Sequence, residues 1–144
     1  MTKIFILLVE DEADMRELVT YWLKSILEDT DKVDTAENIE QARALLARQA
    51  YDIIFLDLNL KDSKGLDTLD EIKSICQSKS DIVLLTGMSI PENDWRKLGV
   101  AGYLEKISLT KEKVKEKVRA YLKIKSFSKA VDRAERALAA LQFS

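Results

Sequence analysis

The chain has 144 residues, of which 47% are hydrophobic and 33% charged, and its 23 basic and 25 acidic residues leave a net charge of −2. This size and composition predict one soluble globular domain and exclude a large multidomain protein, a fibrous protein and a disordered chain. The sequence contains no histidine, which excludes histidine-ligated metals, Ser-His-Asp and Cys-His catalysis, and a phosphorelay histidine within this chain.

The single cysteine, Cys76, cannot form an internal disulfide. The N-terminal residues lack the pattern of a secretory signal, and the longest apolar run, residues 4–9, is far too short to span a membrane. We therefore expect a cytoplasmic protein with no membrane partner, because the cytoplasm keeps thiols reduced.

Strand and helix patterns alternate along the first part of the chain. Residues 4–9 form a continuous apolar run, which predicts a buried strand, and residues 15–27 carry apolar side chains at helical spacing. Residues 32–36 are more polar and alternate weakly, as in an edge strand. Asn38 and Gln41 form a capping-box pattern, which predicts the start of a second helix.

The same alternation continues to residue 122. Short apolar runs at residues 53–56 and 82–85 predict two more buried strands, and residues 102–104 predict a shorter one. The predicted helices of this part cover residues 66–76, residues 91–98 opened by Pro91 and ended by Gly99, and a last segment with the apolar stripe Val114, Val118, Tyr121 and Leu122. Five alternating units predict an α/β fold whose parallel sheet has helices on both faces.

Polar residues follow the predicted strands at the edge of the sheet where open α/β folds bind ligands. They are Glu10, Asp11 and Glu12 after the first strand, Asp57 after the third, Thr86 and Gly87 after the fourth, and Lys106 after the fifth. Carboxylates gathered in this way repel one another unless a cation lies among them, and an all-oxygen site suits Mg²⁺.

This set of side chains has the chemistry needed for phosphoryl transfer to an aspartate. Asp57 can act as the nucleophile, and Glu10 and Asp11 can bind Mg²⁺. Lys106 would supply the counter-charge for the phosphoryl oxygens, and Thr86 would donate a hydrogen bond to them.

The ordered set resembles the receiver domain of two-component response regulators over residues 1–123. The resemblance is carried by the acidic pair after the first strand, by Asp57 with its neighbours, by Thr86 with Gly87, and by Lys106 after the Gly-Tyr-Leu-Glu segment. It implies a flavodoxin-like, doubly wound, five-stranded parallel sheet of order 2-1-3-4-5. In that order the weakly patterned residues 32–36 lie at an edge.

The resemblance also implies a reaction and its ligands. Asp57 would accept a phosphoryl group from a phosphohistidine on a sensor histidine kinase or a histidine phosphotransfer protein. Mg²⁺ would be held by Glu10, Asp11, Asp57 and the backbone carbonyl of Asn59. The chain would catalyse only its own phosphorylation and dephosphorylation, so it would not be an enzyme with a separate substrate.

A switch is implied by the same resemblance. Phosphorylation would draw the Thr86 hydroxyl inward, and Tyr103 would turn into the vacated space. The surface around the fourth helix and fifth strand would then change its preference for a downstream effector protein or domain.

Two positions depart from the pattern of the family. Ile107 follows Lys106 where the family usually has a proline in a cis peptide, so the loop is either trans and reshaped or retains a costly cis bond. Lys61 also stands where proline is common, which leaves the shape of residues 60–64 open.

Residues 124–144 extend beyond the receiver domain and continue a helical pattern. Ile124, Phe127, Val131, Ala134, Leu138 and Leu141 follow the alternating spacing of coiled-coil a and d positions. The extension is interpreted as a dimerisation helix or a linker to an output domain, with a tail folded back on its own domain as the alternative. Residues 111–136 contain ten basic and four acidic residues, but without a DNA-binding motif we expect no nucleic-acid partner.

Two other functions compete with the phosphorylated switch. A haloacid-dehalogenase-like phosphatase also uses an aspartyl nucleophile after a strand, but it needs a second aspartate where this chain has Asn59. A phosphorylation-independent interaction domain would keep the fold and lose the switch, and Ile107 is the residue that favours it.

Overall fold

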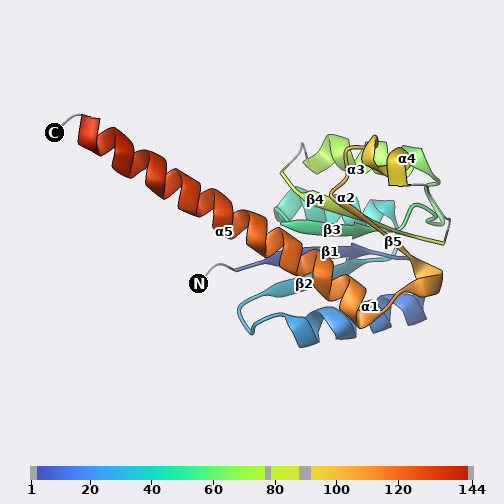
Figure 1. Ribbon diagram of the computed structural model, residues 1–144. Helices are drawn as coiled ribbons and strands as arrows, with labels where there is room; N and C mark the ends of the chain where they lie inside the picture. Colours follow the sequence, from blue (N-terminus) through green and yellow to red (C-terminus); the bar gives the residue numbers. More distant parts are fainter. Residues whose placement is uncertain (1–2, 77–78, 88–91, 143–144) are drawn as a thin grey trace.

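The computed structural model describes residues 3–76, 79–87 and 92–142. Five parallel strands form one sheet with helices on both faces (Figure 1). The sheet order is β2-β1-β3-β4-β5, which confirms the predicted topology. The strands are β1 (Phe5–Val9), β2 (Lys32–Ala36), β3 (Ile53–Leu56), β4 (Asp81–Thr86) and β5 (Gly102–Glu105).

The register brings the carboxyl ends of β1 and β3 to one level, and β4 continues two residues further, to Thr86. Val9 of β1 pairs with Leu56 of β3, and Leu56 pairs with Leu84 of β4. Every residue of β3 is buried, as expected for a strand covered on both faces, whereas β2 at the edge keeps exposed and half-buried positions. The side chains that follow β1 and β3 therefore leave the sheet side by side.

Two helices cover one face of the sheet and three cover the other (Figure 1). Buried side chains of α1 and α5 pack with those of β1, β3 and β4 in one core cluster, and buried side chains of α2 and α3 belong to the second cluster. The helices are α1 (Ala13–Ile26), α2 (Ile39–Arg48), α3 (Leu66–Cys76), α4 (Glu92–Arg96) and α5 (Lys111–Gln142).

Local signals in the sequence set the ends of two helices. Asn38 accepts a hydrogen bond from the Gln41 backbone N–H at 2.8 Å, which confirms the predicted start of α2. Gly99 follows α4 with a φ of +71°, a conformation that favours glycine and ends the helical segment. Pro91, predicted to open this helix, lies outside the described residues.

Three residues of the apolar patterns that predict helices are exposed. Leu18 of α1 is 43% exposed, Leu66 of α3 is 53% exposed and Leu122 of α5 is 39% exposed. Leu122 lies one position beyond Tyr121, about 100° further around the helix, so it leaves the face that packs on the sheet. The stripe correctly predicts a helix in this segment, and its burial ends at Tyr121.

Helix α5 runs without interruption past the domain. Val114, Val118 and Tyr121 are buried, and the residues from Leu122 to Gln142 are exposed. Figure 1 shows this second part extending away from the sheet, so it is not folded back on its own domain. The predicted boundary between residues 123 and 124 falls inside this continuous helix. Within the described ranges, no helix combines the length and apolar character needed to cross a membrane.

Candidate functional site

Two buried carboxylates lie where β1 and β3 end. The Asp57 backbone N–H donates to the Val9 carbonyl at 3.0 Å, and the Glu10 N–H donates to the Ala36 carbonyl at 2.9 Å. These bonds continue the strand pairing by one residue, so Glu10 and Asp57 are held by the sheet itself. Both residues are almost completely buried, which is costly for carboxylates without a partner.

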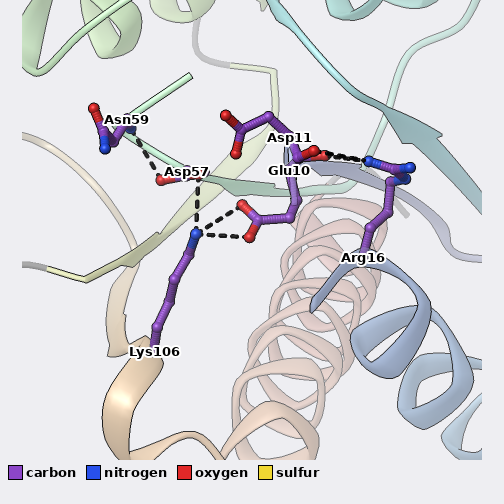
Figure 2. Close-up of polar contacts among 6 residues, drawn as sticks. All are labelled: Glu10, Asp11, Arg16, Asp57, Asn59 and Lys106. Atoms are coloured by element: carbon purple, nitrogen blue, oxygen red, sulfur yellow. Dashed lines mark hydrogen bonds and ion pairs between the residues drawn. The ribbon is translucent and has the colours of Figure 1, made fainter. Parts of the chain in front are cut away.

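Lys106 supplies that partner. Its Nζ donates to both oxygens of Glu10, at 2.6 and 2.9 Å, and to Oδ2 of Asp57 at 3.0 Å (Figure 2). Lys106 opens a short 3₁₀ helix (Lys106–Ser108) directly after β5, and the next residue, Ile107, is 90% exposed. No cis peptide bond occurs in the described ranges, so the bond from Lys106 to Ile107 is trans. The lysine therefore reaches both carboxylates without the proline that is usual in the family.

The electrostatics of this cluster couple the three groups. Burial, together with a hydrogen bond to Asp57, raises the pKa of Glu10 to about 8, although Lys106 opposes the shift. Burial by itself would lower the pKa of Lys106, but its bonds to Glu10 and Asp57 outweigh burial and raise it. When Glu10 is ionised, one ammonium faces two negative carboxylates, so a further cation would be attracted to the site and would favour this ionised form.

Three carboxylates at this site fit a divalent cation. Glu10, Asp11 and Asp57 each offer an oxygen, and the three oxygens lie within 4.8 Å of one another. Hard oxygen ligands of this kind suit Mg²⁺. Asn59 lies beside them, because its backbone N–H donates to Oδ1 of Asp57 at 2.9 Å while its side chain is exposed (Figure 2). The three predicted carboxylate ligands are therefore brought together, and the Asn59 carbonyl stays a predicted ligand.

The two predicted switch residues lie on neighbouring strands and share a neighbour. Thr86, the buried last residue of β4, pairs in register with Glu105 of β5. The Tyr103 hydroxyl donates to Oε1 of Glu105 at 3.2 Å, and its ring stacks on Trp95 of α4 with centroids 6.4 Å apart. Tyr103 is half-buried in this arrangement. The switch itself stays a prediction.

Sequence reasoning missed Arg16. Its Nη1 donates to the Glu10 carbonyl at 2.9 Å and lies 3.4 Å from the Asp11 carbonyl, and its Nη2 pairs with Glu37 at 3.2 Å. Figure 2 shows Arg16 on the backbone side of the acidic pair. The position of Arg16 could have indicated its role. A positive charge near the N-terminus of a helix interacts unfavourably with the helix dipole, so an arginine there suggests a specific hydrogen-bond partner.

Comparison with known proteins places this site in a family. The family model described as "Response regulator receiver domain" matches residues 6–119. The chain is 41% identical over 69 residues to the sensory transduction protein LytR of Staphylococcus saprophyticus, covering 48% of this chain and 27% of that protein. It is 35% identical over 103 residues to the alginate biosynthesis transcriptional regulatory protein AlgB of Pseudomonas aeruginosa, covering 70% and 22%. The chain thus spans about a quarter of the length of these relatives.

Solved structures agree with the sequence matches. The response regulator TrrA of Thermotoga maritima, in complex with Mg²⁺ and BeF, is 32% identical with a TM-score of 0.67, covering 82% of this chain and 98% of that one. A two-component response regulator from Clostridium difficile is 25% identical with a TM-score of 0.71, covering 83% and 96%. From the sheet order, the site at its carboxyl edge and these matches, the chain belongs to the response regulator receiver domain family.

Proposed function

We propose that this chain is a phosphorylation-switched receiver of a two-component or phosphorelay system, and that Asp57 accepts the phosphoryl group. The observation that carries the proposal is the Lys106 ammonium, which contacts Asp57 and Glu10 at once from the end of a different strand. A nucleophilic carboxylate, a neighbouring carboxylate for a metal and a cation for the phosphoryl oxygens are the parts that phosphoryl transfer needs.

The reaction starts from a phosphohistidine on a partner kinase or phosphotransfer protein. A carboxylate oxygen of Asp57 attacks phosphorus, the P–N bond breaks, and the leaving imidazole keeps the electron pair and takes up a proton. Lys106 stays beside the reacting oxygens and balances their charge. Mg²⁺, when bound, neutralises charge on the phosphoryl oxygens, and its ligands would be Glu10, Asp11, Asp57 and the Asn59 backbone carbonyl.

The acyl phosphate on Asp57 then changes the surface formed by α4 and β5. Its charge is close to −2, and the Thr86 hydroxyl at the end of the neighbouring strand can donate to it. Tyr103 would leave its contact with Glu105 and turn toward the space that Thr86 vacates. Because Tyr103 also stacks on Trp95, this movement alters the face formed by α4 and β5, which a downstream effector protein or domain would recognise.

The chain would act in the cytoplasm and only on itself. Cys76 is a buried free thiol, which fits a reducing compartment. The chain would catalyse its own Mg²⁺-dependent phosphorylation and dephosphorylation and would have no separate substrate.

Intact-protein mass spectrometry tests the proposed reaction. The purified chain is incubated with Mg²⁺ and a small-molecule acyl phosphate, beside the nearly isosteric Asp57→Asn variant. We expect one labile phosphoryl group on the parent and none on the variant. Absence of any addition to the parent would instead favour the phosphorylation-independent interaction domain, and hydrolysis of a generic phosphomonoester would favour a phosphatase.

We also propose that the second half of α5 forms a homodimer with the same segment of another copy. Ile124 and Leu141, at the two ends of its a/d seam, are 62% and 73% exposed, although both are large apolar residues. Charged residues such as Asp132, Arg133 and Arg136 fall outside the a and d positions. A helix that is apolar along one seam and charged elsewhere is typical of a coiled coil.

A further inference from the structure

The start of α2 contacts both loops that carry the carboxylates of the site. Arg16, which follows the loop after β1, reaches Glu37 just before α2. Asp62, in the loop after β3, reaches the first two backbone N–H groups of α2, those of Ile39 and Glu40, at 3.0 and 3.3 Å. A side chain from the first turns of α1 and one from the loop after β3 therefore meet at one helix end.

Arg16 fixes the backbone of the loop after β1. Its side chain is only 17% exposed, and its two strongest contacts use different nitrogens, Nη1 on the Glu10 carbonyl and Nη2 on the Glu37 carboxylate. A guanidinium is rigid and planar, so these bonds also fix the direction in which the peptide at Glu10 lies. The orientation of that peptide determines where the Glu10 and Asp11 carboxylates can point.

Asp62 fixes the loop after β3 in a comparable way. Its two oxygens accept from the first and second N–H groups of α2, while Asn38 accepts from the third, so three of the four N–H groups that every helix leaves free have side-chain partners. A carboxylate at this end also interacts favourably with the helix dipole.

The loop that Asp62 holds contains Asn59. Within it, the Leu60 N–H donates to the Ser63 carbonyl at 3.0 Å, and Asn59 forms a β-bridge with Lys64. Position 61 is a lysine, so no proline ring restricts the backbone of this turn. The hydrogen bonds from the N–H groups of α2 to Asp62 restrict it instead.

We propose that Arg16 and Asp62 are positioning residues that tie both ligand-bearing loops to the start of α2 and so fix the Mg²⁺ ligands. The proposal rests on the metal site of the proposed function and adds the residues that preorganise it. Groups that orient metal ligands commonly change metal affinity by 10- to 100-fold when they are removed. Neither residue is one of the proposed Mg²⁺ ligands, so both would act through the backbone that carries Glu10, Asp11 and Asn59.

Isothermal titration of the full chain with MgCl₂ tests this proposal. For Arg16→Gln and for Asp62→Ala we expect the Kd for Mg²⁺ to rise about tenfold. Arg16→Lys should rescue little, because an ammonium cannot bridge the carbonyl and Glu37 as a planar fork does. Asp62→Asn should rescue part of the loss, because its amide oxygen can still accept one hydrogen bond.

Control variants test whether a change in the Kd for Mg²⁺ comes from the loss of these specific contacts or from the loss of any charged side chain. Glu17→Gln and Asp70→Asn each remove one exposed carboxylate, on α1 and on α3, outside these contacts; both should keep the Kd within twofold of the parent. At saturating Mg²⁺, phosphorylation of the Arg16 and Asp62 variants by an acyl phosphate should return to within about twofold of the parent rate.

The outcomes distinguish this inference from the proposed function. A parent that binds Mg²⁺ while Arg16→Gln and Asp62→Ala bind it equally well would overturn the inference and leave the proposed function intact. A fall in the free energy of unfolding without a change in Kd would also overturn it. A parent that binds no Mg²⁺ would overturn the metal site itself and, with it, this inference.

Discussion

The ammonium of Lys106 lies 3.0 Å from Oδ2 of Asp57, although 49 residues separate the two in the chain. The sheet explains this contact, because β5 and β3 both end at the same edge and β4 lies between them. The same ammonium is bonded to Glu10 at the end of β1. One side chain therefore links the ends of three strands.

Replacing Lys106 by methionine should slow phosphorylation of Asp57 about a hundredfold. The change keeps an unbranched side chain that is one atom shorter and removes the charge proposed to stabilise the phosphoryl oxygens. Removal of one such donor typically costs 10²–10³ in rate. The rate of mass gain with an acyl phosphate donor at saturating Mg²⁺ measures the effect. Lys123→Met, on an exposed turn of α5, should keep the parent rate. Equal rates for both variants would remove Lys106 from the mechanism.

The stability of the metal-free chain should depend on pH through Glu10. Its pKa is raised to about 8 in the folded chain, from the ordinary value of 4.5. Between these values the folded state binds more protons than the unfolded state. The free energy of unfolding should therefore fall as the pH rises, by at most about 1.4 kcal/mol per pH unit for this one proton.

Urea unfolding between pH 5 and 8 without Mg²⁺ measures this dependence. The chain has no histidine, so the groups that usually dominate this range are missing. Glu10→Gln should remove the slope, and saturating Mg²⁺ should flatten it by holding Glu10 deprotonated. A slope of the same size in Glu10→Gln would assign it to another group.

The sheet and its polar edge could be predicted because they depend on local patterns. The apolar run before Glu10 and the short run before Asp57 identify buried strands, and a parallel sheet brings the residues after such strands together. The weak pattern of residues 32–36 placed that strand at the edge, where the structure has β2. The apolar patterns indicated the polar edge of the sheet, whereas the strand order came from the resemblance to receiver domains.

The supporting contacts could not be predicted in the same way. Arg16 and Glu37 are 21 residues apart, and Asp62 and Ile39 are 23 apart, so no local spacing relates them. The sequence also left open whether the peptide bond from Lys106 to Ile107 is cis or trans. The structure has a trans bond there, at the start of the 3₁₀ helix (Lys106–Ser108). The apolar spacing that includes Leu122 predicts a helix, but it does not show where the surface covered by that helix ends, and Leu122 is 39% exposed.

Replacing Tyr121 by phenylalanine should destabilise the domain by about 1–2 kcal/mol. The Tyr121 hydroxyl donates to Oδ1 of Asp52 at 2.9 Å, and Oδ2 of the same carboxylate accepts from the Phe5 N–H at 2.8 Å. Loss of a hydrogen bond to a charged, partly buried acceptor costs about this much. Urea unfolding at pH 7 measures the change. Tyr21→Phe, on an exposed position of α1, should change the free energy of unfolding by less than about 0.5 kcal/mol.

Substitution of Val131 by aspartate should reduce self-association if the α5 seam joins two copies. Val131 occupies an a position of the seam, so in a dimer the two introduced aspartates would be buried close to each other, which is unfavourable. Sedimentation velocity should show the monomer for Val131→Asp and for a chain that ends at residue 123, and the dimer for Arg136→Ser, outside the seam. Unchanged association after the truncation would place the contact on the receiver domain instead.

The most direct test of the account is to identify the residue that carries the phosphoryl group. The chain is phosphorylated with an acyl phosphate and Mg²⁺, reduced with borohydride, which converts a phosphoaspartate to homoserine, and sequenced by tandem mass spectrometry. We expect homoserine at position 57 and nowhere else in the chain. Homoserine at Asp11 or at another aspartate, with Asp57 unchanged, would contradict the assignment of Asp57 as the phosphoacceptor.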